Sequence, residues 1–314
     1  MRAFLCHCAI VLISASMCAL SQAQPLRSAQ LEIIRGKPFV PVMVNGKGPF
    51  RFVIDTGTGG EAFVTRELAQ RLALPVTGQA RVSDPSGQGQ QRAPIVTIGS
   101  LQVAGVEFHG VKAVEHTLSD GDGPCDGLLG FKLFRDHLLT LDFPNRRMEL
   151  AEGALVRDGG KGVLPFRAAD GVPVIALRVD GTQIDALIDS GGAGLSLPEA
   201  LAARLRFEAD PVEFSHGESL STRFQIKAAR LAGEVGVGRY KFDRPFLEIN
   251  PAFPLADFGS SAMQDFALTF DQRSGLVRFA SRKKSLRLAA TPPPLGLNAT
   301  PPPRPADPSL VPVG

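Results

Sequence analysis

The sequence has 314 residues, of which 44% are apolar and 21% charged, within the usual range for a globular protein. The formal net charge is +3 and the two signs are interspersed, so no basic stripe is indicated and we expect no nucleic-acid partner. The 33 glycines and 25 prolines indicate many turns between short strands, which favours a mainly β fold.

Residues 1–23 are expected to be a signal peptide. Residues 3–20 are almost all apolar, and a small-x-small cleavage pattern follows at 21–23. A membrane anchor is disfavoured because the apolar run is short for a span and is followed by that pattern. A lipid anchor at Cys18 is disfavoured because the residue before it suits the motif poorly. We expect an exported protein, periplasmic or secreted, with no integral membrane segment once the leader is removed.

Three of the four cysteines lie in this leader, which leaves Cys125 alone in the mature chain. An exported domain with a single thiol has no internal disulfide, so an ordinary packed core must hold it. A nucleophilic role for Cys125 is disfavoured because no motif places a histidine near it.

The central part of the chain contains an internal repeat. The stretch 40–46 returns as 172–181, and each copy runs through a turn into an apolar strand. The first strand, within 50–57, ends in Asp-Thr-Gly, and the second, within 184–191, ends in Asp-Ser-Gly. The two aspartates are 134 positions apart, so a duplication of a whole lobe is indicated.

The segments after each aspartate match as well. Short strands at 63–65 and 195–197 each lead into a short amphipathic helix. Thr65 is suited to cap the first helix, and Pro198 is suited to the first turn of the second. Further along, 139–150 and 268–279 each have the pattern of a β-hairpin.

These repeats define the expected organisation. The expected segments are a signal peptide (1–23), an N-terminal lobe (30–152), a linker (153–162), a C-terminal lobe (163–282) and a disordered proline-rich tail (291–314). Each lobe is predicted to be mostly β, with one or two short helices.

A pair of carboxylates has a specific chemical use. Peptide hydrolysis without a metal or a covalent nucleophile needs an activated water, which two carboxylates sharing one proton supply. Each carboxylate must then sit at the end of a rigid buried strand, followed by a small hydroxyl residue and a glycine. The segments 53–57 and 187–191 both meet these requirements, which makes Asp55 and Asp189 the candidate catalytic residues.

With these two motifs the chain resembles the pepsin/retropepsin superfamily of aspartic proteases, in a bacterial retropepsin-like form with two fused lobes. Each lobe of that family also carries a second apolar-Gly element beside the active-site loop. Its counterparts here are 126–130 and the more divergent 257–261. The resemblance implies a two-lobed acid-protease-like fold in which each lobe is a small closed β-barrel.

The resemblance also implies supporting residues in both active-site loops. They are Thr56, Gly57 and Thr58 in the first loop and Ser190, Gly191 and Gly192 in the second. Thr58 suits the family pattern because its hydroxyl can hydrogen-bond near its carboxylate, whereas Gly192 has no side chain to do so. The site is therefore expected to be asymmetric.

Pepsin-like enzymes place a flap tyrosine over the substrate, but Tyr240, the only tyrosine, lies late in the second lobe. The flaps are instead predicted as flexible turn-rich loops at 83–89 and 215–218. Their candidate residues are Ser86, Gly87, His216 and Gly217. Ordinary hairpin turns fit these segments equally well.

No metal or cofactor is expected, because the histidines lack ligand spacing and the acidic loop 120–124 lacks the further acids of a calcium site. The function predicted is that of an aspartic endopeptidase acting on peptides or proteins. The alternative is a catalytically weak or inactive peptide-binding module on the same fold. A monomer is expected, since a fused pair of lobes needs no second copy to complete its site.

Overall fold

The structure, a computed structural model, describes residues 27–83, 89–117, 125–218, 223–283, 286 and 288. The predicted signal peptide (1–23) and proline-rich tail (291–314) lie outside these residues. Within the described part of the chain, no helix has both the length and the apolar character needed to cross a membrane.

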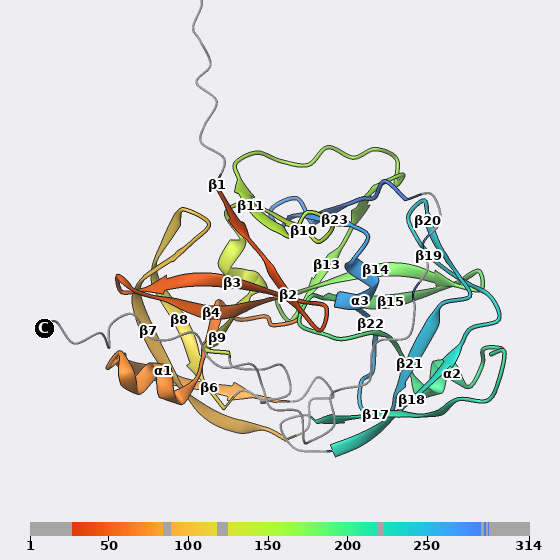
Figure 1. The fold of residues 1–314 in the computed structure, drawn as a ribbon, viewed down its shortest axis with the longest axis horizontal. Coiled ribbons are helices and arrows are strands. Elements are labelled where there is room, and N and C mark those ends of the chain that lie inside the picture. Colours follow the sequence, from red (N-terminus) through yellow and green to blue (C-terminus); the bar gives the residue numbers. More distant parts are fainter. Residues whose placement is uncertain are drawn as a thin grey trace, which may run out of the picture.

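The fold is mainly β, as predicted, and has two lobes that lie side by side (Figure 1). The N-terminal lobe is coloured red to yellow and the C-terminal lobe green to blue. Each lobe is built on its own sheet, and a third sheet with strands from both lobes runs along one side of the molecule.

The sheet of the N-terminal lobe closes on itself. Its strands follow the order β2-β3-β4-β9-β5-β8-β7-β6, and an additional pairing joins β3 to β7. The ring therefore runs from β3 through β4, β9, β5, β8 and β7 back to β3. The strands are β2 (Glu32–Ile34), β3 (Lys37–Val44), β4 (Lys47–Asp55), β5 (Ala62–Val64), β6 (Val76–Val82), β7 (Gln91–Val103), β8 (Val106–Glu115) and β9 (Gly127–Gly130).

The sheet of the C-terminal lobe repeats this order, but the counterparts of two strands are each split: β7 corresponds to β18 and β19, and β8 corresponds to β20 and β21. β18 pairs with β17 and β21, whereas β19 pairs with β14 and β20. The full order is β17-β18-β21-β16-β22-β15-β14-β19-β20, with β13 (Arg167–Ala169) beside β14. The strands are β14 (Val172–Val179), β15 (Thr182–Asp189), β16 (Leu195–Pro198), β17 (Val212–Glu218), β18 (Arg223–Arg230), β19 (Glu234–Val237), β20 (Tyr240–Asp243), β21 (Phe246–Asn250) and β22 (Ala256–Gly259).

A six-stranded sheet joins the lobes, in the order β1-β11-β10-β23-β24-β12. Its two hairpins, β10–β11 and β23–β24, confirm the predicted ones. β10 pairs with β23 across the lobes, and Thr140 lies opposite Thr269 with their Oγ1 atoms 3.0 Å apart. The strands are β1 (Arg27–Gln30), β10 (Leu138–Asp142), β11 (Arg147–Ala151), β12 (Val163–Pro165), β23 (Ala267–Asp271) and β24 (Leu276–Ala280).

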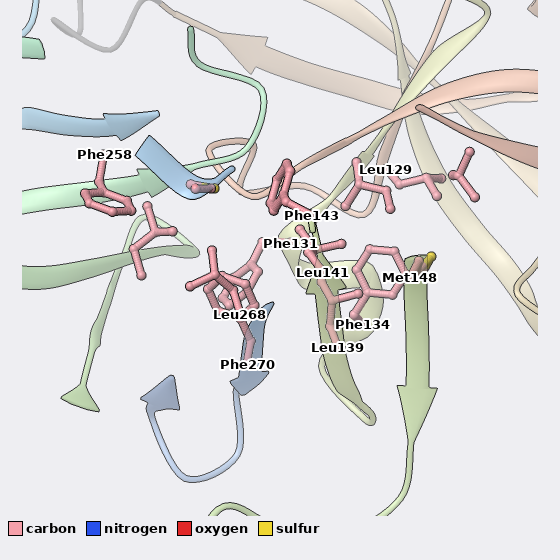
Figure 2. Close-up of a cluster of buried hydrophobic side chains, with 14 of the residues drawn as sticks. Leu129, Phe131, Phe134, Leu139, Leu141, Phe143, Met148, Phe258, Leu268 and Phe270 are labelled. Carbon is pink, nitrogen blue, oxygen red and sulfur yellow. The ribbon is translucent and has the colours of Figure 1, made fainter. Parts of the chain in front are cut away.

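Buried side chains from both lobes pack together beneath this sheet, as Figure 2 shows. The ring of Phe131, from the N-terminal lobe, meets that of Phe270, on β23, edge-on with 5.3 Å between ring centroids. Both side chains are buried, and burying a phenylalanine stabilises a fold by about 2–3 kcal/mol. The two lobes therefore share one apolar core, which holds them in a fixed relation.

The helices are short. They are α1 (Arg66–Arg71), the 3₁₀ helix η2 (Phe131–Phe134), α2 (Glu199–Ala202) and α3 (Ser260–Met263). Thr65 caps α1 as predicted, because its Oγ1 accepts a hydrogen bond of 3.1 Å from Leu68 N. Pro198 lies one position before α2 rather than in its first turn. Residues 153–162, predicted as the linker, contain neither strand nor helix.

Candidate active site

The two Asp-containing loops leave equivalent strands of the two lobes. Asp55 is the last residue of β4 and Asp189 the last of β15, and a fully buried isoleucine precedes each. Each aspartate lies beside a parallel strand, with Asp55 opposite Gly130 on β9 and Asp189 opposite Gly259 on β22. Because both neighbouring strands are packed in their lobes, each carboxyl group starts from a rigid backbone position.

The hydroxyl residues after the aspartates lock the loops to each other. Thr56 Oγ1 donates to Ile188 O at 2.7 Å and accepts from Ser190 N at 3.0 Å. In return, Ser190 Oγ donates to Ile54 O at 2.6 Å and accepts from Thr56 N at 3.1 Å. Both side chains are fully buried. Four hydrogen bonds in a dry environment thus fix the position of one loop against the other.

The glycines of the two motifs bring the carboxyl groups together. Gly57 N donates to Asp55 Oδ1 at 2.9 Å, and Gly191 N donates to Asp189 Oδ1 at 2.8 Å. A β-carbon on Gly57 would lie 2.5 Å from Oδ1 of Asp189, and one on Gly191 would lie 2.5 Å from Cγ of Asp55. Each carboxyl group therefore rests against the glycine of the opposite lobe, and any side chain there would push the two apart.

The charges of the two carboxyl groups interact strongly. Burial, the negative charge of Asp189 and a hydrogen bond with Asp189 together raise the pKa of Asp55 from 3.8 to about 8. The hydroxyl of Thr58 and the positive charge of Lys37 act in the opposite direction. Two carboxylates this close do not both ionise readily, so the pair retains a proton at neutral pH.

The site is asymmetric beyond this pair. Thr58 Oγ1 donates to Asp55 Oδ2 at 3.0 Å, and Gly192, which has no side chain, occupies the same position in the second lobe. Beside Gly192 lies Asp257, a buried acid on β22. The sequence analysis placed Asp257 in the divergent element 257–261 but gave it no role. The match of 257–261 with 126–130 is wrong in register, because strand pairing makes 256–259 the counterpart of 127–130 and puts Asp257 where the first lobe has Leu128.

A turn of each lobe also contacts the other lobe, at α3 in one case and at an Asp-containing loop in the other. Gln264 Nε2, beyond α3, donates to Gly36 O at 3.0 Å, and a β-carbon on Gly36 would lie 2.8 Å from Oγ of Ser260. In the opposite direction, a β-carbon on Gly171 would lie 2.9 Å from O of Gly59, which follows the first Asp-Thr-Gly motif. Sequence reasoning missed these contacts, which lie between segments far apart in the chain.

The predicted flap residues have different outcomes. Ser86 and Gly87 lie outside the described residues. His216 and Gly217 belong to β17 and pair with β18, so they form a strand rather than a loop, and their role as a flap stays a prediction. The ring of Phe224 lies directly against Gly217, where a side chain would collide with it. Pairing and packing thus extend the strand through a segment whose composition resembles a turn.

Two other predicted features concern metals and thiols. Among the residues that the structure describes, no group of three or more His, Cys, Asp or Glu side chains is placed to hold a metal ion. Cys125 donates through Sγ to Gly127 O at 3.0 Å.

Residues 40–133 match a family model described as aspartyl protease. The matched segment begins in β3, includes the whole first Asp-Thr-Gly loop and ends in η2. A search of curated proteins finds no match to the chain.

Proposed function

Since the chain belongs to the aspartic protease superfamily, we propose that it is an endopeptidase in which Asp55 and Asp189 activate a water molecule. One observation carries the proposal. Each aspartate lies against the glycine of the opposite lobe, so that the two carboxyl groups face each other across the interlocked loops.

The retained proton gives the pair two different roles. The ionised carboxylate takes a proton from water while the water oxygen attacks the carbonyl carbon of the peptide bond. The protonated carboxyl donates a hydrogen bond to the carbonyl oxygen and stabilises the tetrahedral intermediate. A proton then passes to the amide nitrogen, the C–N bond breaks, and a carboxylic acid and an amine are released. This division of roles is the established one for aspartic proteases as a class.

The surrounding residues support both roles. Backbone N–H groups of Gly57 and Gly191 each hold one oxygen of their own aspartate, which fixes the plane of each carboxyl group. Thr58 holds the second oxygen of Asp55. Both aspartates are only partly buried, so solvent and substrate have access to them.

The proposal extends to substrate, location and assembly. The substrate is an extended peptide or protein segment, which suits a site flanked by β strands. The protein acts outside the cytoplasm, as the leader-like residues 1–23 suggest. It acts as a monomer, because one chain supplies both carboxyl groups.

The test is cleavage of a mixed peptide library from acidic to neutral pH, with and without pepstatin, read by mass spectrometry. We expect fragments from the wild type and none from Asp55→Asn or Asp189→Asn, each of which keeps the shape of the side chain. The matched control is Asp185→Asn. Asp185 lies on β15 like Asp189, but its side chain is half exposed and forms an ion pair with Arg167. This variant should cleave like the wild type.

Two outcomes would contradict the proposal. Undiminished cleavage by either dyad variant would place the chemistry elsewhere. Peptides that the wild type retains but never cuts would instead indicate a peptide-binding module.

A further inference from the structure

The second lobe lacks the hydroxyl with which the first lobe holds its aspartate. In the first lobe, Thr58 Oγ1 donates to Asp55 Oδ2 at 3.0 Å. In the second lobe, Gly192 stands at that position and has no donor in its side chain. Backbone bonds at the two positions are the same, since Thr58 N reaches Asp55 O and Gly192 N reaches Asp189 O, both at 3.2 Å. Only the side-chain donor differs.

The carboxyl group of Asp257 fills the space that a side chain on Gly192 would need. A β-carbon on Gly192 would lie 2.6 Å from Oδ2 of Asp257 and 3.1 Å from Oδ2 of Asp189. The two carboxyl groups therefore border the same small volume. Asp257 reaches it from β22, where it pairs with Leu187 on β15, two residues before Asp189.

Asp257 is a buried acid at a position that the fold does not require to be acidic. Its exposed fraction is 8%, and its Oδ1 has no hydrogen-bond partner among the described residues. The equivalent residue of the first lobe, by its pairing with β4, is Leu128. A leucine at this position therefore suits the fold, whereas a buried carboxyl oxygen without a hydrogen bond destabilises it.

The charges that face Asp257 are mostly negative. Glu248 on β21 is also buried and points at the same loop, where a side chain on Gly194 would collide with it. Burial first, and then the charges of Asp189, Glu248 and Asp55, raise the pKa of Asp257 well above 3.8, while Lys37 lowers it. Burial and the surrounding negative charges thus favour the protonated form of Asp257.

From this geometry we propose that Asp257 is a positioning residue: a neutral carboxylic acid that donates a hydrogen bond to Asp189, as the Thr58 hydroxyl does to Asp55. Its effect on catalysis rests on the proposed endopeptidase function, but its protonation does not. When Asp257 ionises at higher pH, the donor is lost and a negative charge appears beside Asp189. The second lobe thus has a donor that depends on pH, whereas the first has one that does not.

The first test needs no substrate. Infrared titration detects the carbonyl stretch of protonated carboxylic acids, and we compare the wild type with Asp257→Asn at neutral pH. We expect the variant to lose one such acid, and the control Asp185→Asn to lose none. Equal numbers of protonated acids in the wild type and Asp257→Asn would overturn the proposal, whether or not the protein cleaves peptides.

The second test compares three variants in peptide cleavage. Asp257→Leu copies the first lobe and removes the donor, so kcat should fall about tenfold, the value of one hydrogen bond of ordinary strength. KM should change little, and the melting temperature at neutral pH should not fall, because the leucine removes a buried acid of raised pKa. Asp257→Asn keeps an N–H donor and should restore kcat, with its alkaline limb moved to higher pH. Gly192→Thr combined with Asp257→Leu rebuilds the first-lobe arrangement and should also recover activity.

A purely structural role predicts other results. Wild-type kcat and an unchanged pH profile in Asp257→Leu would overturn the proposal. So would an Asp257→Asn variant as slow as Asp257→Leu, because its amide still donates. If Asp257→Leu does not fold, Asp257→Asn and the infrared titration still decide the question.

Discussion

The two active-site loops have equivalent backbone hydrogen bonds but different surrounding side chains. The hydroxyl groups of Thr56 and Ser190 each make two equivalent hydrogen bonds to the opposite loop. Each glycine lies against the carboxyl group of the opposite lobe. The side-chain donor, by contrast, is Thr58 in one lobe, and an acid stands near Gly192 in the other. The parts that hold the carboxyl groups together are therefore alike in the two lobes, while the side chains that surround each carboxyl group differ.

The largest expected effect separates Asp55, whose pKa is raised, from the exposed acid Asp185. Asp55 ionises with an ordinary pKa of 3.8 when unfolded and of about 8 when folded. Below pH 3.8, Asp55 is protonated in both states and does not reduce the free energy of unfolding. As pH rises from 3.8 to about 8, this free energy declines, because only the unfolded state releases the proton. Asp55→Asn removes this decline and should stabilise the protein by up to about 4 kcal/mol at pH 7, at about 1.4 kcal/mol per pKa unit.

The measurement is thermal unfolding by circular dichroism, in acid and at neutral pH. The gain of Asp55→Asn should disappear in acid, and Asp185→Asn should show no gain at either pH. A melting temperature of Asp55→Asn that is unchanged or lower at neutral pH would contradict the raised pKa.

The next effect tests the contact between each glycine and the opposite aspartate. Gly57→Ala and Gly191→Ala should each reduce kcat/KM at least about a hundredfold, because displacing catalytic groups by about 1 Å has this cost. Gly60→Ala is the matched control in the same loop, since its nearest neighbour beyond the adjacent residues would be 3.7 Å from the new methyl group. A Gly57→Ala variant as active as Gly60→Ala would show that the carboxyl groups are not so close.

Breaking the symmetric lock should have a smaller effect, on stability. Thr56→Val keeps the shape but leaves Ile188 O and Ser190 N without their buried partner. We expect a loss of about 2 kcal/mol in the free energy of unfolding, measured by urea denaturation. Thr56→Ser, which copies the second lobe, should unfold like the wild type. Equal stability of the valine and serine variants would argue against the lock.

The smallest effect comes from making the first lobe like the second. Thr58→Gly removes the partly buried hydrogen bond to Asp55, and kcat should fall about fivefold, since one hydrogen bond contributes about 1 kcal/mol. Thr58→Ser retains the hydroxyl and should keep most of the activity. The assay is steady-state cleavage of a peptide identified in the library. Equal rates for the two variants would show that the Thr58 hydroxyl does not assist Asp55.

The comparison of lobes also shows what sequence could predict. The mainly β fold, the two hairpins of the six-stranded sheet and the cap at Thr65 follow from local patterns in the sequence. The two Asp loops were found because a repeated motif is more specific than one copy. The strand at His216 was missed because its composition is that of a turn and only pairing with β18 reveals it.

The rest depends on contacts between distant segments. β7 is one long strand, whereas its counterpart is interrupted near Leu231, which bridges to Phe207 instead. No local pattern announces that break. Similarly, Asp257 stands in a degraded copy of a first-lobe element, and only its position beside Gly192 gives it a role.

The central claim is that carboxyl groups from two lobes meet and hold one proton between them. A neutron crystal structure of the deuterated protein near neutral pH tests this most directly, because it locates hydrogen positions. We predict a single deuteron between the carboxyl oxygens of Asp55 and Asp189. Two bare carboxylates, or oxygens too far apart for a hydrogen bond, would contradict the account.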